Sequence, residues 1–146
     1  MLSLKDSIKQ IHYVRLVKDE DILPSLILYC KNNKIESGFV IGIGAVKKAN
    51  LGYFDVTSNQ YLSKKFDFNA EILNCSGNVS KKANTDEYVI HIHILIGDRE
   101  CRSFGGHLMN DTIISVTGEF VIVETSDPLT RKLDEEFGLF LLNFTR

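Results

Sequence analysis

The fold of this chain is decided by residues 87–108, EYVIHIHILIGDRECRSFGGHL. From residue 89 to residue 96 the side chains alternate with a period of two, which predicts a β-strand with two unlike faces. One face carries His91, His93 and Leu95, and the other carries Ile90, Ile92, Ile94 and Ile96. We expect the isoleucine face to belong to a core, which leaves both imidazoles together on the other face.

Three of the four histidines lie in this stretch. The Cα atoms of His91 and His93 are expected roughly 6.5 to 7 Å apart, so both rings can reach one ion. The returning strand that follows carries His107 behind Gly105 and Gly106, where a neighbouring backbone or a ligand can approach closely. Three histidines suit zinc and leave a fourth position for water. The alternative is that these are ordinary packed or solvated side chains, because His-x-His is a weak pattern by itself.

Length and composition predict one domain. The chain has 146 residues, of which 44% are hydrophobic and 25% charged, enough for a sizeable core. We expect a lead-in over residues 1–10 and a single domain over residues 11–146. The net charge of −2 gives no general attraction to nucleic acid or to anionic membranes.

Three cysteines without C-x-x-C spacing do not indicate a disulfide framework. The first ten residues lack the apolar run of a signal peptide, and no stretch has the length of a membrane span. These features predict a cytoplasmic protein.

The remaining segments predict an α+β fold with one mostly antiparallel sheet flanked by one or two helices. The first helix is expected to have Asp21 or Glu20 as its cap and Pro24 in its first turn, and a second helix is expected over residues 127–137. The other strands are expected at residues 11–17, 37–49, 50–56, 112–124 and 139–144, with residues 66–80 forming strands broken around Gly77-Asn78.

Together these features resemble the PPC domain (plant and prokaryote conserved domain), in its stand-alone prokaryotic type. The resemblance runs from about residue 13 to residue 124, and its motifs are short but specific in combination. The matching features, in chain order, are the strand of Arg15, EDI at 20–22, SGFVIGIGAVKKANLGYFD at 37–55, EIL at 71–73, GNVS at 77–80, HIH at 91–93, GGHL at 105–108 and GEF at 118–120.

The resemblance implies a largely antiparallel sheet flanked by helices, and assembly as a homotrimer. It also implies a zinc site at His91, His93 and His107. Members of the family are commonly labelled DNA-binding because plant proteins join the domain to AT-hook motifs. This chain contains no Arg-Gly-Arg-Pro hook, which together with its negative charge argues against direct DNA binding.

The first hypothesis is therefore a trimeric ligand-binding or regulatory module with a three-histidine zinc site. Neutral imidazoles leave the zinc site positively charged, so we expect it to attract a small anionic ligand. Glu71 and Glu119 are candidates to accept hydrogen bonds from the imidazole N–H groups. Arg15 is a candidate to orient the anion, and Gly105 and Gly106 to let it approach.

Two other functions remain open at the level of the sequence. One is a metal-dependent hydrolase or lyase acting on a small anionic substrate, since zinc with an open position activates water. No general acid or base can be identified for it. The other is sequence-tolerant DNA binding, which needs one face to gather the paired lysines Lys47, Lys48, Lys64, Lys65, Lys81 and Lys82.

Overall fold

A computed structural model describes residues 2–144, in which nine strands and one helix form a single domain. The elements are β1 (Ile8–Val17), α1 (Ile22–Asn33), β2 (Gly38–Asp55), β3 (Gln60–Phe66), β4 (Ala70–Lys82), β5 (Tyr88–Gly97), β6 (Ser103–Leu108), β7 (Ile113–Thr125), β8 (Thr130–Asp134) and β9 (Leu139–Leu142). Within these residues no helix combines the length and the apolar character needed to cross a bilayer.

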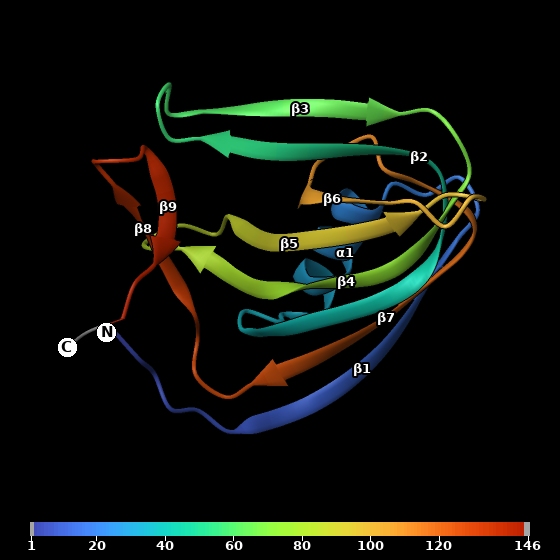
Figure 1. Ribbon diagram of the computed structural model, residues 1–146. Coiled ribbons are helices and arrows are strands. Elements are labelled where there is room, and N and C mark those ends of the chain that lie inside the picture. The colour runs from blue at the N-terminus through green and yellow to red at the C-terminus, as the bar shows by residue number, and fades with distance from the viewer. Residues whose placement is uncertain (1, 145–146) are drawn as a thin grey trace.

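The strands form one mixed sheet in the order β1-β7-β2-β6-β5-β4-β8-β9, with β3 paired to β2. The pairing is antiparallel except between β4 and β8, so the expected sheet type is confirmed. The long strand β2 changes partners along its length: its first half lies between β7 and β4, and its second half pairs with β3 and β6. The sheet therefore curves strongly around β5 (Figure 1).

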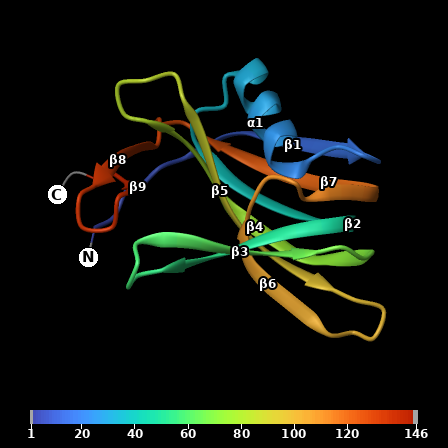
Figure 2. The ribbon, with the colours of Figure 1, turned by 90° about the horizontal axis from the view of Figure 1, so that it is seen from above.

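The helix α1 begins as its sequence predicts. Asp21 is the N-cap residue with an extended backbone (φ −82°, ψ 125°), and Pro24 lies in the first turn, where no N–H is needed. Lys34 ends the helix in the left-handed conformation, with φ 56°. The helix buries Ile22, Leu26 and Cys30 against β5 and β7, and Figure 2 shows it covering one side of the sheet.

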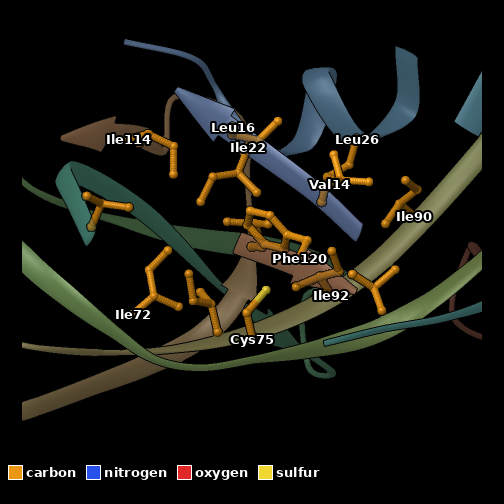
Figure 3. Close-up of a cluster of buried hydrophobic side chains, with 14 of the residues drawn as sticks. Val14, Leu16, Ile22, Leu26, Ile72, Cys75, Ile90, Ile92, Ile114 and Phe120 are labelled. Atoms are coloured by element: carbon orange, nitrogen blue, oxygen red, sulfur yellow. The ribbon is translucent and has the colours of Figure 1, made fainter. Parts of the chain in front are cut away.

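The core lies between this helix and the concave side of the sheet. Figure 3 shows Phe120 at its centre, with Ile92 of β5 and side chains from β1, α1 and β4 around it. All four isoleucines of β5 are at most 5% exposed, while Leu95 on the other face is 39% exposed. The predicted alternation of β5 is therefore confirmed.

The second expected helix, over residues 127–137, is wrong. Thr130–Asp134 and Leu139–Leu142 form the antiparallel hairpin β8–β9, and Gly138 (φ 67°) lies in its turn. Asp127 and Pro128 are the local start signals of a helix, but pairing of Lys81 and Lys82 with the first residues of β8 overrides them. Figure 1 shows this hairpin beside the left-hand ends of the other strands.

Several strand boundaries also differ from expectation. The two strands expected over 37–49 and 50–56 are one strand, β2, and β4 continues through Gly77-Asn78 without a break. The lead-in is shorter than ten residues, because β1 begins at Ile8 and pairs with the end of β7. Residues 145 and 146 of the expected domain lie outside the described residues.

The continuity of β4 depends on the missing side chain of Gly77. A Cβ atom at this position would lie 2.0 Å from the carbonyl oxygen of His91, so β4 and β5 would have to separate. We predict that Gly77→Ala lowers the free energy of unfolding by about 1–3 kcal/mol, as overpacking does. The neighbouring exposed residue gives the matched control Ser76→Ala, expected to change stability by less than about 0.5 kcal/mol. Urea denaturation measures both, and equal midpoints for the two variants would contradict the prediction.

Candidate metal centre

The three histidines of residues 87–108 meet on the face of the sheet opposite α1. His91 and His93 lie on β5, and His107 on β6 is the direct partner of His93. Paired residues of adjacent strands point to the same face, so the register brings the third ring to the other two. Each of the three residues offers a donor atom within 4.8 Å of the others.

The spacing of the donors fits a tetrahedral ion. The Nε2 atoms of His91 and His93 are 3.3 Å apart. Nitrogens bound at 2.0 to 2.1 Å to a tetrahedral zinc ion are about 3.3–3.4 Å from each other, so this pair already has the required separation. The third ring is near both, with centroid distances of 4.9 Å to His91 and 5.6 Å to His93.

The electrostatics of the cluster favour neutral imidazoles. Burial, with the neighbouring His91, His93 and Arg131, lowers the pKa of His107 to about 4. Burial also lowers the pKa of His91, with smaller contributions from Arg131 and His93. The buried Nδ1 atom of His107 has no hydrogen-bond partner among the described residues. Neutral imidazole is the form that binds metals, so His91 and His107 need no deprotonation at neutral pH.

The two glycines before His107 act through the backbone. A Cβ atom on Gly106 would lie 2.8 Å from the carbonyl oxygen of Gly52 on β2, so only glycine lets β6 run against β2 at this point. His107 and Leu108 then pair with Gly52 and Leu51. Of the two approaches that the sequence allowed at Gly106, the structure shows the close approach of a neighbouring strand.

Arg131 on β8 also reaches this site. No local pattern in the sequence predicts that this residue contributes. The side chain is buried, and its guanidinium donates three hydrogen bonds: from Nε to Ser80 Oγ (2.8 Å), from Nη1 to the carbonyl oxygen of Phe140 (2.7 Å) and from Nη2 to Asn78 Oδ1 (2.7 Å). Asn78 is paired with His91 across β4 and β5. The arginine therefore ties the hairpin β8–β9 to the strand next to the histidines.

A cavity of about 310 Å³ opens between the histidines and this hairpin. His91, His107 and Arg131 supply polar groups to its wall, and the ring of Tyr61 on β3 lies 4.9 Å from the ring of His107. The remaining wall comes from α1, from the start of β5, from β9, and from Lys82 and Glu87. Neither Tyr61 nor β9 was predicted to contribute to the site, since both reach it only through long-range pairing.

The structure places Arg15, Glu71 and Glu119 away from the histidines. Arg15 and Glu119 are paired across β1 and β7. Glu71 is paired with Gly97, and it lies seven positions along β4 from Asn78, a distance of about 23 Å. Glu71 and Glu119 instead share a shallow cavity with Thr117.

The paired lysines are largely neutralised by carboxylates. Five of the six form ion pairs: Lys47 with Asp19, Lys48 and Lys65 with Asp111, Lys81 with Glu36 and Asp86, and Lys82 with Glu87. Each pair removes local positive charge, so these residues do not form the continuous basic surface that phosphate backbones require.

Comparison with known proteins gives one family. The model of the Plants and Prokaryotes Conserved (PCC) domain matches residues 4–126. Two curated relatives come from two Synechococcus strains, and both are named bifunctional protein GlmU. Each is 26% identical to this chain, over 94% of the chain for one and 81% for the other. These alignments cover 21% and 17% of the relatives, so the chain spans about a fifth of their length.

Solved structures of similar fold cover nearly the whole chain. A PPC protein from Pyrococcus horikoshii is 27% identical, with a TM-score of 0.88 over 100% of this chain and 99% of its own. A protein from Archaeoglobus fulgidus described as metal-containing is 29% identical, with a TM-score of 0.87 over 98% and 99%. A Bacteroides thetaiotaomicron protein named as a candidate DNA-binding protein is 29% identical, with a TM-score of 0.86 over 97% and 99%.

We predict that Arg131→Met loosens the hairpin β8–β9. The substitution leaves the buried Ser80 Oγ, and the part-buried Asn78 Oδ1 and Phe140 carbonyl oxygen, without their donor. An acceptor left unsatisfied in a buried place costs about 1–3 kcal/mol. Amide hydrogen exchange of residues 128–144 should therefore become faster, while that of β5 changes less. Lys132→Met at the exposed neighbouring position is the matched control. The prediction fails if both variants exchange at the native rate.

Proposed function

The chain belongs to the Plants and Prokaryotes Conserved domain family, and we propose that it is a zinc-containing module that binds a small anionic ligand and has a regulatory role. The family resemblance inferred from the sequence is thereby confirmed. The observation that carries the proposal is the 3.3 Å separation of the His91 and His93 Nε2 atoms, with His107 beside them.

Zinc fits this donor set better than harder ions. Imidazole nitrogens suit zinc and other late divalent metals, whereas magnesium and calcium prefer oxygen ligands. Three neutral ligands leave a bound zinc ion with its full positive charge and an open fourth position. The description of the A. fulgidus relative as metal-containing supports metal binding by a chain of this fold.

Binding without turnover fits the site better than a hydrolase or lyase. An enzyme of that kind needs a free carboxylate or a comparable base near the metal. The carboxylate in the cavity wall is Glu87, and its Oε1 atom lies 2.5 Å from the ammonium nitrogen of Lys82. This carboxylate is engaged by Lys82, so it is not the free base that such an enzyme needs.

A direct role in DNA binding has less support than ligand binding. The B. thetaiotaomicron relative is named as a candidate DNA-binding protein, but in this chain most of the paired lysines are engaged by carboxylates. We therefore propose that regulation by this protein proceeds through its ligand and its assembly.

We further propose that the chain forms a homotrimer through the face of the sheet opposite α1. Phe39, Ile41 and Ile43 point outward from β2, with 45%, 47% and 59% of their surface exposed. Register places Tyr13 of β1 and Val121 of β7 in the same row as Ile41. This apolar stripe is of the kind that marks a protein interface.

We predict about one zinc ion per chain in protein purified without a histidine tag. The double variant His91→Ala/His93→Ala should lose the metal, because a single remaining imidazole does not hold zinc against buffer. Elemental analysis measures the zinc directly, without any assay of activity.

His12→Gln is the matched control for the zinc measurement. His12 is the fourth histidine, and its ring contacts Tyr29 and Glu124 at 3.3 Å in a separate cluster. This variant should keep the native zinc content. Absence of zinc from the native protein, even after zinc is offered at neutral pH, would refute the proposed function.

Assembly is tested by Ile41→Lys, with Leu28→Lys on the outer side of α1 as the matched control. The two side chains are similarly exposed: 58% of the surface of Leu28 and 47% of that of Ile41 is accessible. A lysine buried in an interface is costly, so Ile41→Lys should shift the mass in sedimentation velocity from three protomers to one. Leu28→Lys should remain trimeric. A native protein that sediments as a monomer would contradict the prediction.

A further inference from the structure

We propose that the cavity beside the three histidines binds a compact monocarboxylic acid with an apolar body, held by Arg131 and by the metal. This inference rests on the proposed zinc site, which would take one carboxylate oxygen, and it names the chemical class of the anionic ligand. It follows from the shape of the cavity, from an uncompensated buried charge and from the residues of the wall.

The cavity exists because β5 is longer than its partner β6. Pairing between these strands covers only His93 to Gly97 of β5, whereas pairing with β4 continues to Tyr88. The first five residues of β5 therefore have a strand on one side only. The cavity lies at this free edge. Its volume of about 310 Å³ is at the lower end of the size range of small-molecule sites.

The positive charge of Arg131 favours an anionic ligand. Arg131 is 5% exposed, and its three acceptors, Ser80, Phe140 and Asn78, are all neutral groups. A guanidinium has five N–H donors, so two remain for a ligand. Burying a charge without a counter-ion is unfavourable, and a carboxylate bound at this point would remove that cost.

The other cation of the wall is already compensated. Lys82 forms an ion pair with Glu87, and its ammonium nitrogen lies 4.3 Å from the centre of the Phe140 ring. The uncompensated charge is therefore that of Arg131, to which a bound zinc ion would add its own. Because Asn78 joins the guanidinium to the strand position opposite His91, both positive centres lie at the same end of the cavity.

Much of the remaining lining of the cavity is apolar. Leu23 and Ile27 of α1, with Leu139 and Leu141 of β9, offer aliphatic surface, and Tyr88 and Phe140 add aromatic rings. Such a wall suits a small hydrocarbon or aromatic group. It does not suit a sugar phosphate or a nucleotide, whose many hydroxyl and phosphate oxygens would lose hydrogen bonds to water without replacement.

The proposal is tested by titrating zinc-loaded protein with three probes: benzoate, acetate and inorganic phosphate. Benzoate should bind about tenfold or more tightly than acetate, because its ring buries apolar surface that acetate lacks. Phosphate should bind no better than acetate. Isothermal titration calorimetry gives the three affinities, and amide chemical shifts locate the bound benzoate.

Two leucines of the same hairpin provide a matched pair of variants. Leu141 lines the cavity and is 40% exposed, whereas Leu133 is 54% exposed and does not line it. Leu141→Glu places a negative charge in the binding site and should weaken benzoate binding about tenfold or more. Leu133→Glu should leave the affinity within about twofold, since its charge stays in solvent. Both variants should keep the native zinc content.

Failure of this proposal is distinguishable from failure of the zinc site. Stoichiometric zinc together with no preference for benzoate over acetate, or equal affinities of the two leucine variants, would overturn the carboxylate site and leave the metal site standing. Lack of zinc together with benzoate binding that Leu141→Glu weakens would refute the metal site and support the cavity, with Arg131 as its anchor.

Discussion

The register of β5 is the constraint on which the rest of the structure depends. Successive residues of a strand face opposite sides, so one register places four isoleucines in the core and two histidines on the outer face. A slip by one residue would bury the imidazoles and expose the isoleucines. The same pairing with β6 brings His107 opposite His93. Stability of the core and geometry of the metal site are thus set together.

Local sequence patterns were sufficient to predict the parts of the site that lie close together in the sequence. The alternation around His91 and His93, and the glycines before His107, predicted the three-histidine cluster. Arg131 and Tyr61 could not be predicted in this way, because their contacts depend on the pairing of β8 with β4 and on the curvature of β2. At Asp127 and Pro128 the local signals favoured a helix, and a long-range strand pairing overrode them.

Glu71 and Glu119 were predicted to lie near the histidines and do not, which shows what a sequence motif cannot predict. Both lie in motifs that match the family, and a motif by itself gives no distance to the histidines. Register gives that distance. It pairs Glu71 with Gly97, four residues beyond His93, and it pairs Glu119 with Ile43, so that β2 and β4 separate Glu119 from the histidines. It also shows that Tyr13, Val121, Ile41, Ser76, His93 and His107 form one row across the sheet. The apolar stripe and the histidines are separated by β4 alone, about 10 Å. Assembly through the stripe would therefore take place next to the metal site, close enough for one to influence the other.

The hydrogen bonds of Arg131 stabilise the hairpin, but stability alone does not explain why the residue that makes them is charged. A buried charge that is hydrogen-bonded only to neutral groups stabilises a fold less than a packed apolar cluster built in its place would, although removing the arginine alone leaves its acceptors unsatisfied. The arginine instead keeps a positive charge at the edge of an apolar cavity, with two donors unused and no carboxylate within its set of partners. Its three hydrogen bonds to neutral groups orient the guanidinium and leave its charge intact. An arginine that only fastened a hairpin would be expected to pair with an acid, whereas one that binds an anion must remain unpaired until the anion arrives.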